Sequence, residues 1–205
     1  MNVDLMVDIE TLGSENKHTV PIISIAARKF SFVNGTVDTE YLYREISLKS
    51  AVADGVIEYG TLNWQLTTNR TEFLRYLESS KNGVSTLIAL QDFVNYIPKE
   101  RGYNLWAQGK DFDLPILQGA CNRLGVKFTT PYYKFRCSRD YQDFALFHLG
   151  YTKNAGKEWL DSNVTRKGTY HNAIDDVDTQ IAKVLFLKES LFKLTSSTKQ
   201  PLDSE

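Results

Sequence analysis

The chain has 205 residues and a mass of 23.4 kDa, and its 42% hydrophobic and 24% charged residues fit one globular domain. Lys and Arg (24) nearly balance Asp and Glu (25), so a net charge of −1 excludes binding to nucleic acid by charge alone. Two Cys and three His exclude a disulfide framework and a zinc site of several imidazoles, and no apolar run is long enough to cross a membrane.

Strands come first along the chain. Residues 3–8 and 22–32 are rich in β-branched side chains, and an Asn34-Gly35 turn followed by residues 37–46 predicts a hairpin. Residues 48–98 change to helical spacing and are predicted to form a helical insert. A short buried strand at 103–107 follows, and a helix is predicted over 111–124.

The remainder is predicted as a strand, a helix, a loop and a last helix. Ile174, Val177 and Ile181 begin an apolar stripe on that helix, with Lys183 and Lys188 facing outward. Strands first and alternating elements afterwards predict an α/β fold, with a mixed sheet and helices on both faces. We expect one domain over residues 1–193, and residues 194–205 are predicted to be a disordered tail.

Asp8 and Glu10 stand at the end of the first strand. Because side chains alternate along a strand, both carboxylates point to one face and could chelate a cation. Asp4 and Met6 share that face, so the alternative is a half-solvated strand whose acids lie in water. The pair alone does not separate these interpretations.

Asp113 lies at the start of the helix that follows the strand at 103–107. An acid there is usually a capping residue favoured by the helix dipole. Asp111 could take that role instead, which would leave Asp113 free for chemistry.

His171 and Asp176 flank the start of the last helix. With Asn172 as N-cap, they occupy the two positions that meet across a helix start in a hydrophobic staple. A staple made of an imidazole and a carboxylate suggests a catalytic pair. The alternative is a surface His beside an acidic turn that complements the helix dipole.

Together these residues supply four carboxylates and one imidazole. Crowded carboxylates need cations to neutralise them, and hard oxygen ligands select Mg²⁺ or Mn²⁺ over zinc. Two such ions about 3.5–4 Å apart can activate water and hold both reacting oxygens of a phosphodiester displacement. A His with an ordinary pKa of about 6.5 can accept the proton of that water.

Three motifs carry a family resemblance: Val-Asp-Ile-Glu-Thr-Leu-Gly at 7–13, Gly-Lys-Asp-Phe-Asp at 109–113 and His-Asn-Ala-Ile-Asp-Asp at 171–176. In order and spacing they resemble the motifs of the DEDDh 3′-to-5′ exonucleases, over roughly residues 5–187. The sequence looks closest to the phage and prophage exodeoxyribonuclease group. That group has Arg-Asp-x-Arg-Thr where this chain has Arg139-Asp140-Tyr141-Gln142-Asp143, so only the first two residues match.

The resemblance implies an RNase H-like fold and a metal-dependent enzyme that releases 5′-mononucleotides from 3′ ends, with single-stranded DNA as partner. It assigns Asp8, Glu10, Asp113 and Asp176 as ligands of two divalent cations, Mg²⁺ or Mn²⁺, and His171 as general base. It also implies a bacterial or phage-infected host cytoplasm as location. Oligomeric state and processivity do not follow from it.

Substrate binding must rest on a few cations and on base stacking. The resemblance places Thr11 and Leu12 at the terminal nucleotide, with Leu12 as a wedge. Other candidates come from aromatic and basic segments and from the insert: Trp64, Arg139, Arg166 and Lys167. In the segment 131–136 the alternative is a strand in which Tyr133 and Phe135 are core positions, while Lys134 and Arg136 face solvent. For Trp64 the alternative is packing of the insert.

Three other functions compete with a DNA exonuclease. An exoribonuclease or oligoribonuclease would use the same site and differ in how it reads the 2′-OH. A non-catalytic nucleic-acid binding module predicts the loss of a carboxylate or of the His, and none is lost. A structural or adaptor domain predicts no Mg²⁺ or Mn²⁺ site.

Overall fold

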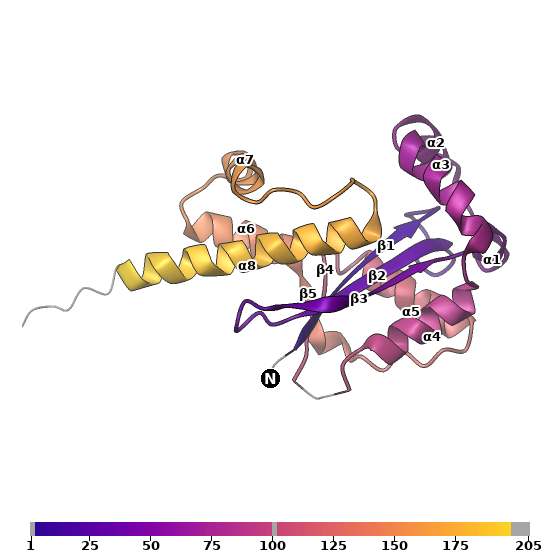
Figure 1. Ribbon diagram of the computed structural model, residues 1–205, viewed down its shortest axis with the longest axis horizontal. Coiled ribbons are helices and arrows are strands. Elements are labelled where there is room, and N and C mark those ends of the chain that lie inside the picture. Colours follow the sequence, from indigo (N-terminus) through magenta and orange to yellow (C-terminus); the bar gives the residue numbers. More distant parts are fainter. Residues whose placement is uncertain (1–2, 100–101, 198–205) are drawn as a thin grey trace, which may run out of the picture.

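The computed structural model describes residues 3–99 and 102–197 (Figure 1). Five strands form one sheet: β1 (Asp4–Thr11), β2 (Ile22–Phe30), β3 (Val37–Glu45), β4 (Leu105–Ala107) and β5 (Phe135–Cys137). Their spatial order is β3-β2-β1-β4-β5. The hairpin strands pair antiparallel with one another and with β1, whereas β1, β4 and β5 run parallel. The predicted mixed sheet is therefore confirmed.

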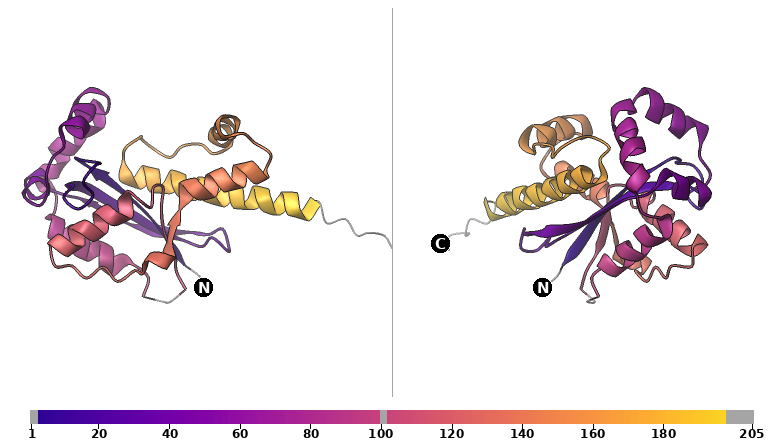
Figure 2. Two further views of the ribbon diagram at one scale, coloured as in Figure 1. Left: turned by 180° about the vertical axis from the view of Figure 1, so that it is seen from behind. Right: turned by 45° about the vertical axis from the view of Figure 1, so that its right-hand side comes forward.

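Helices surround this sheet on both faces, as predicted. The helical elements are α1 (Leu48–Ala53), α2 (Tyr59–Thr67), α3 (Arg70–Ser79), η1 (Ser80–Asn82), α4 (Thr86–Tyr96), α5 (Asp113–Arg123), η2 (Tyr132–Lys134), α6 (Ser138–His148), α7 (Lys153–Asn163) and α8 (Ala173–Ser197). The views of Figures 1 and 2 place α6 and α8 across one face, α7 outside them, and α4 with α5 on the other. Helices α2 and α3 stand at one end of the sheet.

Strand β1 is buried on both faces because it lies in the middle of the sheet. Leu5 and Val7 pack in the core that α4 and α5 cover, whereas Met6 packs in the core under α8. Asp4 is only 3% exposed and accepts hydrogen bonds from the Asn104 side chain and the Trp106 indole. The alternative of a half-solvated strand is therefore wrong for Asp4 and Met6, whereas Asp8 and Glu10 on the same face are partly exposed and line a cavity.

Helix α8 buries the predicted apolar stripe. Val177, Ile181 and Val184 are at most 1% exposed, and each buried side chain of this kind contributes about 1.5–3 kcal/mol to stability. The two lysines predicted to face outward each make a polar contact at the surface. Lys183 pairs with Asp161 at 2.5 Å, and the Lys188 ammonium donates to the Val33 carbonyl at 2.6 Å.

The same helix continues to Ser197, further than expected. The first residues of the predicted tail, from Leu194 on, therefore belong to a helix, and residues 198–205 lie outside the described residues. No helix within the described ranges has the length and apolar character needed to span a membrane.

Two local predictions are wrong. Helix α5 begins at Asp113, and Asp111 is an exposed residue in the preceding turn, so it is not the cap. Tyr133 belongs to the short 3-10 helix η2 and is 65% exposed, so it is not a core strand position, whereas Phe135 begins β5 and packs against the core as that alternative predicted. In both places a turn precedes the regular element, because the chain changes direction there before joining the sheet.

Candidate active site

The five residues assigned by the motifs meet in one cavity of about 460 Å³. It is lined by Asp8, Glu10, Asp113, His171 and Asp176, together with Ile9, Gln108, Gly109, Phe112, Arg139 and Gln180. The first two carboxylates come from the end of β1, and the others come from the starts of α5 and α8. Residues from across the sequence converge because β1 lies centrally, with α5 and α8 on its two faces (Figure 1).

Asp8 is held by a residue that sequence reasoning missed. The Gln180 side-chain amide donates to Asp8 Oδ1 at 2.8 Å. Gln180 lies four residues after Asp176, so both side chains share one face of α8. That i, i+4 spacing from a predicted ligand was the signal that could have identified it.

Asp113 occupies the first position of α5, and no side chain caps this helix. Its side chain is 5% exposed. Burial raises the pKa of Asp113 to about 7, against hydrogen bonds from the backbone of Ile9 and Gly109 and the charge of Arg139, which lower it. A neighbouring cation would lower this raised pKa and would thereby keep the carboxyl group ionised at neutral pH.

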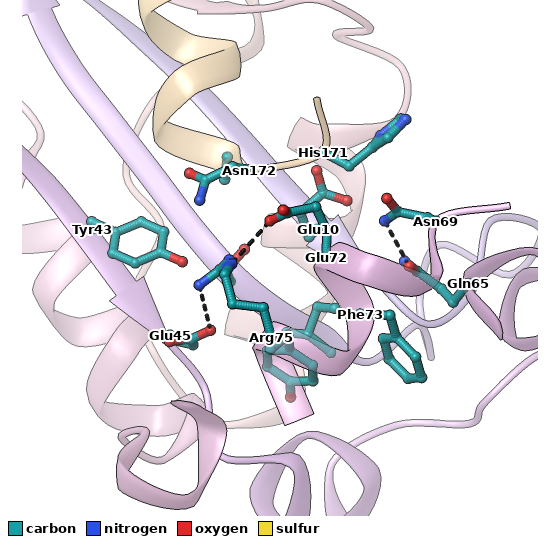
Figure 3. Close-up of a pocket in the computed structure, with 14 residues that line it drawn as sticks. Glu10, Tyr43, Glu45, Gln65, Asn69, Glu72, Phe73, Arg75, His171 and Asn172 are labelled. Carbon is teal, nitrogen blue, oxygen red and sulfur yellow. Dashed lines mark hydrogen bonds and ion pairs between the residues drawn. The ribbon is translucent and has the colours of Figure 1, made fainter. Parts of the chain in front are cut away.

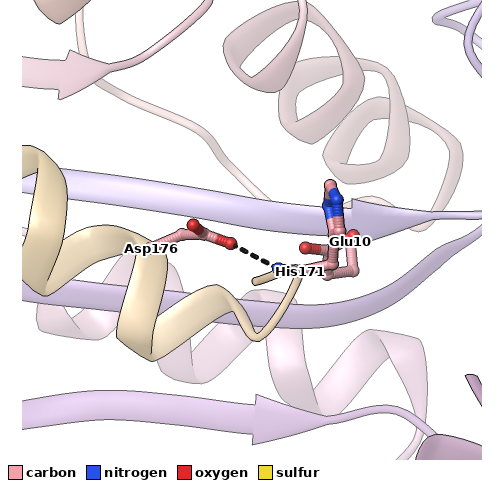
Figure 4. Close-up of side chains that lie close together, drawn as sticks. All are labelled: Glu10, His171 and Asp176. Atoms are coloured by element: carbon pink, nitrogen blue, oxygen red, sulfur yellow. Dashed lines mark hydrogen bonds between the residues drawn. The ribbon is translucent and has the colours of Figure 1, made fainter. Parts of the chain in front are cut away.

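His171 has a left-handed backbone with φ of +61°, which turns its imidazole outward from the start of α8. Its N–H donates to Asp176 Oδ2 at 3.0 Å, so the predicted contact across the helix start is made through the backbone (Figure 4). An imidazole nitrogen and carboxylate oxygens of Glu10 and Asp176 all lie within 4.8 Å of one another. These three residues could share a single ion or a single water molecule.

The loop before His171 is fastened to α8. Arg166 forms an ion pair with Asp176 Oδ1 at 2.7 Å, and its guanidinium lies 3.7 Å from the centre of the Tyr170 ring. The Lys167 N–H donates to Thr179 Oγ1 at 3.0 Å, while the Lys167 side chain is exposed. Of the two predicted substrate cations in this loop, one therefore lies against a predicted metal ligand.

The electrostatics of the cavity suit divalent cations. Burial, reinforced by the neighbouring carboxylates, raises the pKa of Asp8 well above its ordinary value. Glu10 shows the same rise from burial and from Asp176 and Asp113. Carboxylates that repel one another in a buried space ionise together only beside positive charge, and their hard oxygens prefer Mg²⁺ or Mn²⁺. The donor set therefore fits such ions.

The predicted substrate residues lie around this cavity to different degrees. Arg139 lines it directly. Trp64 meets the His171 ring edge-on at 4.8 Å and lines an adjoining cavity with Glu58. Thr11 is 6% exposed and Leu12 is fully buried, so a wedge role for Leu12 would require its side chain to become uncovered.

Glu58 is a second residue that sequence reasoning missed. Its carboxylate accepts hydrogen bonds from the backbone N–H groups of Ser14, Glu15 and Asn16, at 2.7–3.1 Å. Because Glu58 immediately precedes α2, these bonds fasten the helical insert to the turn after β1. No pattern in the sequence links residues so far apart.

A small polar cavity of about 20 Å³ separates the insert from the sheet and shares Glu10 and His171 with the active-site cavity (Figure 3). Arg75 from α3 pairs with Glu72 at 2.9 Å and with Glu45 at 3.8 Å. The charged side chains in this cavity pair mainly with one another, so this network of ion pairs holds the insert beside the site.

Similar folds occur among solved nuclease structures. Cell-death related nuclease 4 (CRN-4) matches with a TM-score of 0.60 and 14% identity, over 100% of this chain and 73% of that one. The nuclease domain of 3′hExo, a DEDDh family member bound to rAMP, gives a TM-score of 0.59 and 11% identity, over 100% and 97%. At such identities the likeness shows the fold alone, and it confirms the RNase H-like architecture.

A longer enzyme shares the fold as well. Exonuclease I from Methylocaldum szegediense matches with a TM-score of 0.65 and 14% identity, over 94% of this chain but only 43% of that one. Among proteins with curated functions, no sequence matches this chain significantly.

A family model gives the closer assignment. The model described as 3′-5′ exoribonuclease Rv2179c-like domain matches residues 3–187, which include all three motifs and every residue of the carboxylate cavity. The chain therefore belongs to the family described as 3′-5′ exoribonuclease Rv2179c-like domains and is a 3′-to-5′ exonuclease.

Proposed function

We propose that this protein hydrolyses single-stranded nucleic acid from the 3′ end and releases 5′-mononucleotides. The observation that carries the proposal is the meeting of four carboxylates and one imidazole in a single cavity of about 460 Å³. General acid–base chemistry on a phosphodiester requires such a proton acceptor beside a site that stabilises charge.

Asp8, Glu10, Asp113 and Asp176 would hold two divalent cations, which supply Lewis-acid activation of water and neutralise the charge of the phosphate. His171 accepts the proton of the attacking water, since its imidazole is exposed and lies within 4.8 Å of the Glu10 and Asp176 carboxylates. Arg166 pairs with Asp176, and its guanidinium would be available to a phosphate if that carboxylate held a cation.

Two polymers are candidate substrates. Single-stranded DNA is favoured by the resemblance of the motifs to the phage and prophage exodeoxyribonuclease group. RNA is favoured by the description of the family model, which covers residues 3–187. The half-buried Trp64 beside His171 does not separate the two polymers, because stacking on an aromatic ring tolerates either sugar.

Digestion of matched 5′-labelled DNA and RNA oligonucleotides with Mg²⁺ or Mn²⁺ tests the proposal. We expect a descending ladder that shortens from the 3′ end, and the faster polymer identifies the substrate. Asp113→Asn should abolish the ladder because it removes one ligand from the carboxylate set. Asp111→Asn is the matched control, since Asp111 is exposed in the same turn and should keep full activity.

A folded wild-type protein that produces no ladder on either polymer would contradict the proposal. Equal activity of the Asp113→Asn and Asp111→Asn variants would also contradict it, because the cavity would then have no role in the reaction.

A further inference from the structure

A second cavity, of about 500 Å³, lies beside the active site. Helices α6, α7 and α8 enclose it, with Leu146 and Leu160 contributing its apolar surface. These three helices gather on one face of the sheet in Figures 1 and 2. Arg139 is the one predicted substrate-binding residue that lines this cavity, and the proposed mechanism assigns no role to the cavity's other residues.

Its charged side chains are mostly basic. Four cations line it, namely Arg139, Lys153, Lys157 and Lys183, against one acid, Asp143. The net charge of the whole chain is −1, so a cluster of positive charges is notable. It lies next to the active-site cavity, which is lined by four carboxylates. The phosphates of a nucleic-acid strand that lie beyond the acidic cavity would be attracted electrostatically to the basic one.

Two of these cations have acidic partners that a phosphate could replace. Lys153 lies 3.7 Å from Asp143, and both side chains are largely exposed, so the pair is weak. Lys183 pairs with Asp161 at 2.5 Å. No acid pairs with Lys157 within the described ranges of the chain, so its charge is available to a ligand.

The two cavities are continuous through shared residues. Gln108 and Arg139 line both of them, and Arg139 is close enough to Asp113 to lower the pKa of that carboxyl. A strand bound at the carboxylates therefore has a direct route past Arg139 into the space between the helices.

Hydrogen-bond donors also lie at the second cavity. Gln142 lines it, and the buried Nε2 of its side chain lacks a partner among residues 3–99 and 102–197. Lys153 and Asn154 belong to the first turn of α7, and no side chain caps that turn. A buried unpaired donor costs free energy, and a helix start attracts anions, so both features favour a ligand with anionic oxygens.

We propose that the cavity between α6, α7 and α8 binds backbone phosphates of the strand on the 5′ side of the scissile bond. This inference rests on the proposed function and adds the path of the substrate. A dinucleotide is too short to fill both cavities, so the second cavity should matter only for longer strands.

Comparison of a dinucleotide with a strand of about 12 nucleotides, both of the polymer that the enzyme prefers, tests this path. We expect the Lys153→Ala/Lys157→Ala double variant to lose about tenfold in kcat/KM on the long strand at low salt, and to keep its kcat/KM on the dinucleotide. Each lost phosphate contact should also flatten the slope of log(kcat/KM) against log[KCl] by about 0.7. Lys49→Ala/Lys127→Ala is the matched control, because both lysines are exposed and line neither cavity.

Equal loss on both substrates, or no loss on either, would overturn the inference. Binding of the long strand, followed by fluorescence anisotropy without hydrolysis, separates this inference from the proposed function. If the wild type binds the long strand more tightly than the double variant does but degrades nothing, the proposed function fails and the phosphate site stands. If the wild type degrades the strand and the double variant binds it equally well, the phosphate site fails alone.

Discussion

His171 shows how one residue can be placed by backbone geometry. Its φ of +61° is uncommon for a residue with a side chain, and the hydrogen bond from its N–H to Asp176 holds it there. The imidazole is thereby free of the helix and lies edge-on to Trp64. The unusual backbone conformation thus occurs at the residue that we propose as the general base.

The proposed base makes a prediction at this scale. Asn tolerates the left-handed backbone, so His171→Asn should keep the fold while lowering kcat by about 10²–10⁴-fold. The carboxylates remain, so stabilisation by Mn²⁺ in a thermal melt should persist. His148→Asn, an exposed histidine at the end of α6, is the control and should leave kcat unchanged. Normal kcat in His171→Asn would assign the proton to another group.

At the scale of elements, the loop at 165–172 is fitted to the first turn of α8. Gly168 has a left-handed φ of +54°, and a Cβ there would lie 2.1 Å from a carboxylate oxygen of Asp175. That carboxylate also accepts the Thr169 N–H at 2.8 Å. The absence of a side chain at Gly168 thus lets α8 hold the loop that carries Arg166 and His171.

Gly168→Ala should release this loop. The added methyl group displaces the Asp175 carboxylate, so we expect kcat/KM to fall by about tenfold or more, with about 1–3 kcal/mol lost from the unfolding free energy. Gly125→Ala separates strain from displacement, because Gly125 has φ of +67° and open space around its Cβ position. It should lose stability through strain and keep its activity. Similar activity in the two variants would show that the contact between the Asp175 carboxylate and this loop has no functional role.

The whole molecule carries its acids unevenly. Its net charge is only −1, yet four carboxylates line one cavity. Burial raises the pKa of Asp8 and Glu10 well above ordinary values and that of Asp113 to about 7. Between pH 4 and 7 these three carboxyl groups therefore bind more protons in the native state than in the unfolded chain, and their contribution to stability falls as pH rises.

Thermal melts across pH test this charge distribution. In EDTA we expect the unfolding midpoint to fall as pH rises from about 5 to 8. Mn²⁺ should raise the midpoint again, most strongly at pH 8. At 100 times its dissociation constant, the ion should add about 2.7 kcal/mol to the free energy of unfolding. Asp113→Asn should flatten the pH dependence and weaken the Mn²⁺ response, because it removes one raised pKa and one ligand. An Mn²⁺ response absent at every pH would contradict a cation site.

The amino-acid order alone predicted most of the strands and helices and selected the five residues that meet in one cavity. Alternating and helical periodicities are local, so the hairpin, the insert and the stripe of α8 could be predicted from neighbours in sequence. Asp8, Glu10, Asp113, His171 and Asp176 could be selected because each motif lies within a few residues.

Tertiary structure alone decided what surrounds them. The Gln180 bond to Asp8, the Glu58 bonds to the turn after β1 and the Arg166 pair with Asp176 depend on which elements pack together. The burial that raises the carboxyl pKa values, and the basic cavity next to them, likewise arise when helices cover both faces of β1. Desolvation and Coulomb interactions act through space, and the spacing of residues along a chain does not specify those distances.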